Sequence, residues 1–200
     1  MDITKAKPLH AEVMSRRRSA LSEACATFLN SESEFVWEVG CGHGHFLTAY
    51  ATAHPDILCV GIDIELDRIE RAERKQARAQ LPNLRFLRAE ARDFISALPK
   101  GARFSAIYML FPDPWPKRRH HKHRLLDTRF LQAVGQRAGQ GTRFYFRTDH
   151  EGYFANAKAT FSCHADWDTC PSAEWPFELP TIFQQKAAQY RSLVAARNRH

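Results

Sequence analysis

Apolar segments alternate with amphipathic segments along most of the chain. Five short runs have the apolar, β-branched and aromatic composition of buried strands; they are residues 35–38, 59–63, 84–88, 104–111 and 142–147. Apolar residues at helical spacing lie between or after these runs, following residue 45, near 66–80, near Phe94, near 129–137 and over 151–159. Strands that alternate with helices predict an α/β fold, with a mostly parallel sheet and helices on both faces.

The two ends of the chain depart from this alternation. Residues 1–30 begin polar and basic, with arginine at 16, 17 and 18, and then place Leu21, Cys25 and Phe28 at helical spacing. This pattern predicts a basic extension with one amphipathic helix, followed by a single domain over residues 31–200. Residues 171–180 are rich in proline and aromatics, which predicts a loop that covers a site or packs on the sheet. A final helix is expected from Thr181.

A glycine-rich turn follows the first predicted strand. Residues 35–44 are FVWEVGCGHG, with Gly40, Gly42 and Gly44 before a helical pattern, and a strand, glycine turn and helix in this order indicate a nucleotide-type cofactor cradle. The dinucleotide spacing needs a third glycine at the position of His45. Glu38 would repel a phosphate but attract an ammonium group. The turn therefore favours S-adenosylmethionine over a dinucleotide.

Acidic residues end three successive predicted strands. Glu38 enters the glycine turn, Asp63 ends the second strand and Glu90 follows the third. An acid at the second position is placed to bond the two ribose hydroxyls of a nucleoside, and Glu90 to approach the adenine amino group. The ordered set predicts one cofactor pocket.

Residues 111–124 are FPDPWPKRRHHKHR, a proline-rich turn that runs into a basic segment. The prolines fix their own φ and disfavour helix before them, so a stiff turn presents Asp113 and Trp115. The cations beyond the turn favour a polyanion. The histidines are not expected to bind a metal, because the neighbouring cations repel one and no cysteine or carboxylate lies at ligand spacing. Trp115 either stacks on a base or packs beneath the turn.

Charge and composition narrow the class of partner. The chain has 200 residues, a formal charge of +7 and 44% hydrophobic residues, and its positive charge is concentrated after the turn, so nucleic acid is the expected partner. No apolar run approaches about 18 residues and the start has no signal-peptide core, so the expected location is the cytoplasm, without a membrane. Five scattered cysteines predict free thiols. The sequence leaves open whether the protein is a monomer or a homodimer.

Asp149 follows the last predicted strand as part of a Thr-Asp pair. Open α/β sheets place ligands at the carboxyl ends of their strands, so Asp149 is a candidate ligand residue. Its alternative role is to cap the helix that begins near residue 151.

These motifs together resemble the bacterial-type tRNA (guanine-N7)-methyltransferases over residues 35–190, and the segment 111–124 is close to that family's signature. The resemblance implies a Rossmann-like, S-adenosylmethionine-dependent methyltransferase domain over 31–200 that methylates N7 of a guanine in the variable loop of tRNA. It implies cofactor contacts by the three glycines and the acids Glu38, Asp63, Glu90 and Asp113. It also implies catalysis at Asp113 and substrate contacts by Lys117, Asp149, Thr181 and Gln184. The cations of the basic segment are expected to hold phosphates of the substrate; they are Lys117, Arg118, Arg119, Lys122 and Arg124.

The expected mechanism is direct in-line methyl transfer. N7 of guanine already carries a lone pair, so the protein has to orient it and to stabilise charge, for which Asp113 is the candidate. The family's late motif has a glutamate and an arginine where this chain has Gln184 and Lys186. An amide has one acceptor and no charge, so either guanine recognition differs here or another acid, such as Glu178, takes that role.

Three other functions stay open on the sequence alone. The turn is also similar to that of amino methyltransferases, so an exocyclic amine of another RNA base is an alternative acceptor. The substituted late motif is consistent with a cofactor- and RNA-binding paralogue without turnover. A small-molecule methyltransferase is disfavoured by the basic segment.

Overall fold

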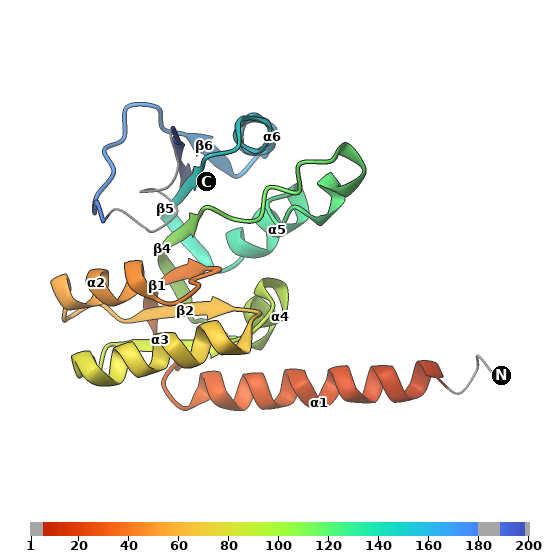
Figure 1. The fold of residues 1–200 in the computed structure, drawn as a ribbon, viewed down its shortest axis with the longest axis vertical. Coiled ribbons are helices and arrows are strands. Elements are labelled where there is room, and N and C mark those ends of the chain that lie inside the picture. The colour runs from red at the N-terminus through yellow and green to blue at the C-terminus, as the bar shows by residue number, and fades with distance from the viewer. Residues whose placement is uncertain (1–5, 180–188, 199–200) are drawn as a thin grey trace.

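The computed structural model describes residues 6–179 and 189–198, and these residues form a seven-stranded sheet with the order β3-β2-β1-β4-β5-β7-β6 (Figure 1). The first five strands are β1 (Glu34–Val39), β2 (Cys59–Asp63), β3 (Leu84–Arg88), β4 (Arg103–Leu110) and β5 (Ala138–Thr148). Strands β6 (Trp167–Thr169) and β7 (Arg191–Arg197) complete the sheet. The five strands predicted from sequence are confirmed, two of them with the expected bounds.

The first five strands are parallel to one another, and β7 runs antiparallel to both of its neighbours. The chain leaves β1 toward β2 and β3 on one side, and returns to place β4 on the other side of β1. In this register Val39 of β1 lies between Ile62 of β2 and Met109 of β4. The strand order therefore reverses beside the glycine turn, and such a switch point is where open α/β sheets bind ligands.

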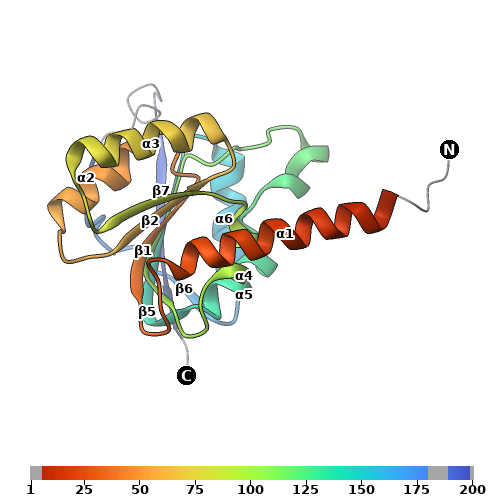
Figure 2. The same ribbon diagram turned by 90° about the horizontal axis from the view of Figure 1, so that it is seen from below.

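Helices cover both faces of the sheet (Figure 2). Helices α2 (His45–Ala53) and α3 (Leu66–Ala79) lie on one face, and α4 (Ala91–Ala97), α5 (Thr128–Gly135) and α6 (Glu151–Ser162) lie on the other. Side chains of β1 alternate accordingly, since Phe35 and Trp37 pack toward α4 and α5 while Val36 packs toward α2. This two-sided burial explains why the strands are apolar throughout.

The N-terminal helix α1 (Ala6–Ala26) extends away from the sheet as a long arm in both views (Figures 1 and 2). It includes the three arginines, so the helix is longer than the amphipathic stretch expected from sequence. Its last turns join the core, where Cys25 is fully buried and Ser22 donates a hydrogen bond to the carbonyl of Ala97. The division into a 1–30 extension and a 31–200 domain stays a prediction.

The C-terminal part of the chain differs most from expectation. Strands β6 and β7 were not predicted, and residues 191–197 are extended. The start of the expected final helix at Thr181 lies outside the described residues. Residues 171–179 pack on the sheet and on α2, since the Trp175 ring meets Tyr145 of β5 and the Phe177 ring meets Phe46 of α2. Within the described ranges, no helix is long and apolar enough to cross a membrane.

Candidate functional site

The glycine turn after β1 has the geometry of a ligand cradle. Gly40, Gly42 and Gly44 all have positive φ, at 71°, 53° and 67°. A Cβ at Gly44 would lie 2.5 Å from the Phe86 ring, so that glycine allows α2 to approach β3. A Cβ at Gly40 or Gly42 would meet no protein atom within 4 Å. The first two glycines therefore border open space, and the third serves packing.

Glu38 lies at the base of this turn with a carboxylate that the protein leaves partly unmatched. The residue is 3% exposed, and its Oε2 has no hydrogen-bond partner among the described residues. Burial raises the pKa of Glu38 to about 8, and the backbone N–H of Leu47 opposes that shift. Burying a carboxyl oxygen without a hydrogen-bond partner costs free energy, and a cationic group of a ligand would supply the missing partner.

Asp63 ends β2 beside Glu38 and is tied to the glycine turn. Its carboxylate accepts hydrogen bonds from the backbone N–H groups of Gly42, at 3.0 Å, and Glu65, at 2.9 Å. Arg68 lies 3.5 Å away. Carboxylate oxygens accept more than one hydrogen bond each, so the expected contact with a ribose stays compatible with these bonds.

Two features of this pocket were missed from sequence. Ile64, directly after Asp63, exposes 58% of its surface and offers an apolar face beside the acid. The sequence did contain a signal for this feature, because an apolar residue directly follows the acid that ends the strand. The ammonium of Lys75 donates a hydrogen bond to the carbonyl of His43, at 2.8 Å, and so holds the glycine turn from α3. No local pattern predicts that contact.

Glu90 begins α4 as its N-cap. Its Oε2 accepts hydrogen bonds from the backbone N–H groups of Arg92 and Asp93, at 2.8 and 3.0 Å. Such caps typically stabilise a helix by about 1 kcal/mol. The expected contact with adenine stays a prediction for this side chain, which has a demonstrated structural role.

The proline turn after β4 is held in an unusual conformation. Phe111 and Trp115 have positive φ, at 50° and 44°, which non-glycine residues rarely adopt. The backbone N–H of Phe111 donates to the carbonyl of Arg147 on β5, at 2.8 Å. Asp113 lies exposed between these two strained residues, at the end of the strand that neighbours β1. Strain of this kind often marks functional sites.

Arg124 differs from the other cations that were expected to hold phosphates. It is 4% exposed, and its guanidinium donates to the carbonyl of Pro114, at 2.8 Å, and to the carbonyl of Gly152, at 3.1 Å. The centroid of the Tyr153 ring lies 4.8 Å from Cζ of the Arg124 guanidinium. In the structure Arg124 therefore connects the proline turn to α6 by hydrogen bonds. The sequence of the basic run did not predict this role.

The rest of the basic run forms an exposed strip. Lys117 precedes the 3-10 helix η1 (Arg118–His123), and the strip consists of Lys117, Arg118, Arg119 and Lys122. Trp115 is 38% exposed and packs against the rings of His120 and His123, with centroids 5.9 and 5.0 Å away. Trp115 thus packs on one side and stays open on the other. No group of three potential metal ligands occurs in the residues that the structure describes.

Asp149 is exposed at the carboxyl end of β5, and it does not cap α6. The cap is His150, whose Nδ1 accepts from the backbone N–H of Tyr153 at 3.1 Å. The capping alternative for Asp149 is therefore wrong, and its carboxylate is left available at the ligand edge of the sheet.

The structure describes the residues that lead to the late motif, up to residue 179, but not the motif itself. Thr181, Gln184 and Lys186 lie outside the described residues. Glu178, the alternative acid, accepts two hydrogen bonds from Arg147, at 2.8 and 3.0 Å, and Arg147 is 4% exposed. Glu178 therefore anchors residues 171–179 to β5 in this structure.

All five cysteines are free thiols. Cys25, Cys41 and Cys59 are buried, whereas Cys163 is exposed. Burial raises the pKa of the Cys25 thiol to about 11 and that of Cys59 to about 12, so neither is a nucleophile at neutral pH.

Comparisons with known proteins agree with this arrangement. A family model described as "Putative methyltransferase" matches residues 32–199. The tRNA (guanine-N(7)-)-methyltransferase of Streptococcus equi subsp. zooepidemicus (strain MGCS10565) is 31% identical over 175 residues, covering 85% of this chain and 82% of the relative. That of Geobacter metallireducens is 35% identical over 129 residues, covering 64% and 61%.

Among solved structures, the 16S rRNA methyltransferase KamB superposes with a TM-score of 0.59 at 18% identity, covering 84% of this chain and 90% of that one. The strand order and this superposition define a Rossmann-like fold. Together with the family model and the relatives, they identify an S-adenosylmethionine-dependent methyltransferase. Within that class, the chain belongs to the tRNA (guanine-N(7)-)-methyltransferase family.

The residues present fit that cofactor. The unmatched Oε2 of Glu38 suits an ammonium, Gly40 and Gly42 border open space, and Asp63 retains acceptor capacity beside the apolar Ile64. Each of these groups lies at the carboxyl end of β1 or β2, or in the turn between β1 and α2.

Proposed function

We propose that this protein methylates N7 of a guanine in the variable loop of tRNA, with S-adenosylmethionine as methyl donor. The observation that carries the proposal is the position of the proline turn. It begins at the end of β4, next to β1 and the glycine cradle, and continues into the exposed basic strip. A carboxylate is thereby presented between a cofactor site and a surface suited to phosphates.

In this mechanism the protein contributes orientation and electrostatics. The bound cofactor supplies an electrophilic methyl group, and N7 of guanine carries its lone pair at neutral pH, so no general base is required. Glu38 and Asp63 hold the cofactor, while Asp113 stabilises the positive charge that develops on the purine. Asp149, exposed at the end of β5, is the second candidate acid to receive the N–H groups of guanine.

The basic strip holds the RNA backbone. Lys117, Arg118, Arg119 and Lys122 are exposed on and before η1, and contacts of this kind fix register on RNA without reading sequence. Trp115 presents an open aromatic surface at the start of the strip, where an unstacked base of a loop can lie. The implied setting is the cytoplasm, where tRNA is the partner.

The decisive test is nucleoside mass spectrometry after incubation with S-adenosylmethionine and an unmodified tRNA transcript. We expect 7-methylguanosine with the wild type and a loss of at least about a hundredfold with Asp113→Ala. Asp56→Ala is the matched control, because Asp56 is exposed on the loop before β2, at the opposite edge of the sheet. A transcript whose variable-loop guanines are replaced by adenines should give no product.

Other products would contradict the proposal in defined ways. A different methylated nucleoside would assign the activity to an exocyclic amine of another base. Cofactor binding without any methylated RNA would indicate a binding paralogue, for which the Gln184 substitution is the motivating feature.

A further inference from the structure

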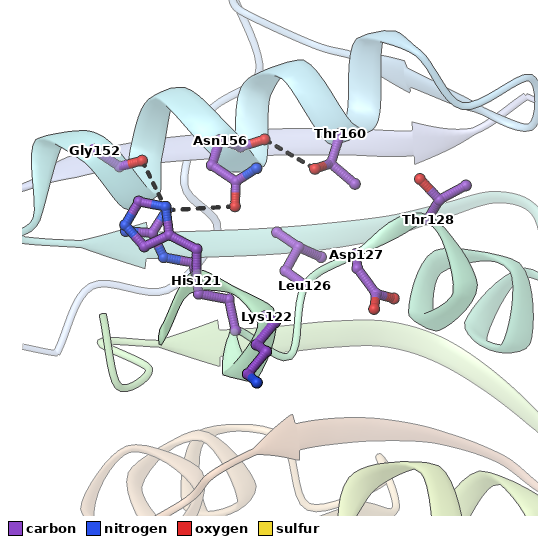
Figure 3. Close-up of a pocket in the computed structure, with 9 residues that line it drawn as sticks. His121, Lys122, Leu126, Asp127, Thr128, Gly152, Asn156 and Thr160 are labelled. Atoms are coloured by element: carbon purple, nitrogen blue, oxygen red, sulfur yellow. Dashed lines mark hydrogen bonds between the residues drawn. The ribbon is translucent and has the colours of Figure 1, made fainter. Parts of the chain in front are cut away.

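A cavity of about 320 Å³ lies between the end of η1, the start of α5 and one side of α6 (Figure 3). Its lining is mostly polar or charged and includes His121, Lys122, Arg124, Asp127, Asn156 and Thr160. None of the acids or glycines of the proposed cofactor pocket lines it. The cavity is therefore a separate feature beside the methyl-transfer site.

The most informative group of this lining is the guanidinium of Arg124. Its partners are the carbonyls of Pro114 and Gly152 and, at 3.5 Å, Oδ1 of Asn156. All three acceptors are uncharged, and Nη2 has no hydrogen-bond partner within residues 6–179 and 189–198. Arg124 thus keeps its charge in a buried position without a neutralising anion, which is an arrangement that costs free energy.

The acid that lines the cavity does not relieve this charge. Asp127 accepts from Nη2 of Arg92 with both carboxylate oxygens, at 3.0 Å each, and from the backbone N–H of Phe130 at 2.7 Å. Its charge is therefore balanced by Arg92. The remaining polar groups of the cavity are an imidazole, an ammonium, an amide and two hydroxyls, none of which carries negative charge. Of the two hydroxyls, that of Thr160 already donates to the backbone carbonyl of Asn156.

Figure 3 shows how these groups are arranged. Asn156 and Thr160 lie along one side of α6, Thr128 lies across from Thr160, and His121 lies near Gly152 at the other end. The ammonium of Lys122 points away from Asn156 in this view. The cavity therefore combines a buried cation with neutral donors on two facing elements.

We propose that this cavity binds a phosphate group of the RNA substrate together with part of its nucleotide. The inference rests on the proposed function, since the RNA is the substrate named there. The volume is that of a small-ligand cavity rather than of a bare ion site. A phosphate here neutralises Arg124. Lys122 belongs both to the cavity lining and to the exposed strip, so the RNA backbone crosses from η1 toward α6.

The position of Arg124 also connects this cavity to the reacting centre. The same guanidinium holds the carbonyl of Pro114, the residue after Asp113. A phosphate that engages Arg124 therefore acts on the side chain that fixes the turn.

The first test replaces the proposed phosphate with an internal carboxylate. In Asn156→Asp the new acid lies at the position of an existing Arg124 partner, so the protein should be at least as thermally stable as wild type. Its affinity for an unmodified tRNA transcript should fall about three- to tenfold, and the slope of log K against log salt should fall by about one. Ala155→Asp places the same charge on an exposed neighbouring position of α6 outside the cavity and should retain the wild-type slope.

The second test reverses the sign. Thr160→Lys adds a cation to the cavity lining and should raise tRNA affinity more than Ala159→Lys, which adds the same charge on an exposed position outside it. Equal affinities and slopes for each cavity variant and its matched control would overturn the proposal, because the effect would then be a general change of charge.

A third measurement separates RNA from a free anion. The melting temperature of the wild type is followed with inorganic phosphate and with chloride at equal ionic strength. Stabilisation by phosphate that Asn156→Asp abolishes, with unchanged tRNA binding, would overturn the RNA assignment in favour of a small-anion site. A loss of tRNA affinity confined to the cavity variants would support it.

The two proposals can fail separately. If the wild type produces 7-methylguanosine while the cavity variants bind tRNA like their controls, the cavity inference fails and the proposed function stands. If the wild type produces none, while Asn156→Asp weakens RNA binding and Ala155→Asp does not, the acceptor assignment fails and the phosphate site stands.

Discussion

The two halves of the ligand edge are built in opposite ways. In the cofactor half, formed by the carboxyl ends of β1 and β2 with the glycine turn, the acids Glu38 and Asp63 are buried and held by backbone N–H groups. In the acceptor half, formed by the proline turn, η1 and the start of α6, Asp113, Asp149 and most cations are exposed. A small ligand is thus met by fixed buried groups, and a large polyanion by an exposed, salt-sensitive surface.

The largest contrast should come from the same substitution at two glycines of the turn. Gly44→Ala combines a left-handed φ with a Cβ 2.5 Å from Phe86, and should destabilise folding by about 3 kcal/mol. Gly42→Ala meets no protein atom, so we expect about 1 kcal/mol from backbone strain alone, together with weaker cofactor binding. Urea unfolding and calorimetric titration measure both quantities. Equal destabilisation would show that the two glycines have the same role.

The buried carboxyl of Glu38 should make cofactor binding depend on pH, because binding requires the release of its proton. Because the pKa of Glu38 is about 8, the carboxyl is mostly protonated at pH 7, and an ammonium binds best after the proton leaves. Affinity for S-adenosylmethionine should therefore rise up to about tenfold per pH unit between pH 6 and 8, with proton release. Titration calorimetry in two buffers of different ionisation enthalpy measures the proton. A pH-independent affinity would place the ammonium elsewhere.

The same residue should affect stability without any ligand. Its folded-state pKa, about 8, is above its ordinary value of 4.5, so between these values the folded state keeps a proton that the unfolded chain releases. Stability contributed by this group is then present below about pH 4.5 and is lost as pH rises toward 8. We expect Glu38→Gln to remove at least about 1.4 kcal/mol of that decline, the value of one pKa unit. Parallel pH-dependent denaturation curves for both proteins would contradict this.

Substitutions in the acceptor half should change the affinity for RNA and its salt dependence, but not the stability of the fold. Single alanine substitutions at Lys117, Arg118 and Arg119 should each lower the salt slope of tRNA binding by about one, with the melting temperature unchanged. Arg103→Ala is a matched control, since Arg103 is exposed at the start of β4, the opposite edge of the sheet. A slope that stays at the wild-type value in all three variants would exclude the strip from RNA binding.

Sequence patterns were most reliable where burial is periodic and local. Strands 59–63 and 84–88 have the predicted bounds, and the glycine turn lies between a strand and a helix as expected from its motif. Strands β6 and β7 were missed because they are short or follow a loop, and their pairing partners are distant in sequence. Arg197 on β7, for example, is buried against Asp166 before β6.

The basic run shows the limit most clearly. Arg118, Arg119 and Arg124 belong to one charged segment and look equivalent in sequence, yet the first two are exposed and the third is buried against α6. Glu90 and Asp149 show the same limit, since Glu90 caps α4, a role that was not predicted, whereas Asp149 does not cap α6, a role that was an alternative for it. Which polar group is desolvated depends on the element that packs above it, and that element comes from elsewhere in the chain.

The sequence alone determined the α/β class, the glycine cradle and the acids at successive strand ends, because backbone periodicity and turn stereochemistry act over a few residues. Only the tertiary structure decided which charges are buried, what Arg124 and Glu178 hold, and where a cavity opens between η1 and α6. Those properties follow from desolvation and from contacts between distant segments, and a linear pattern carries neither.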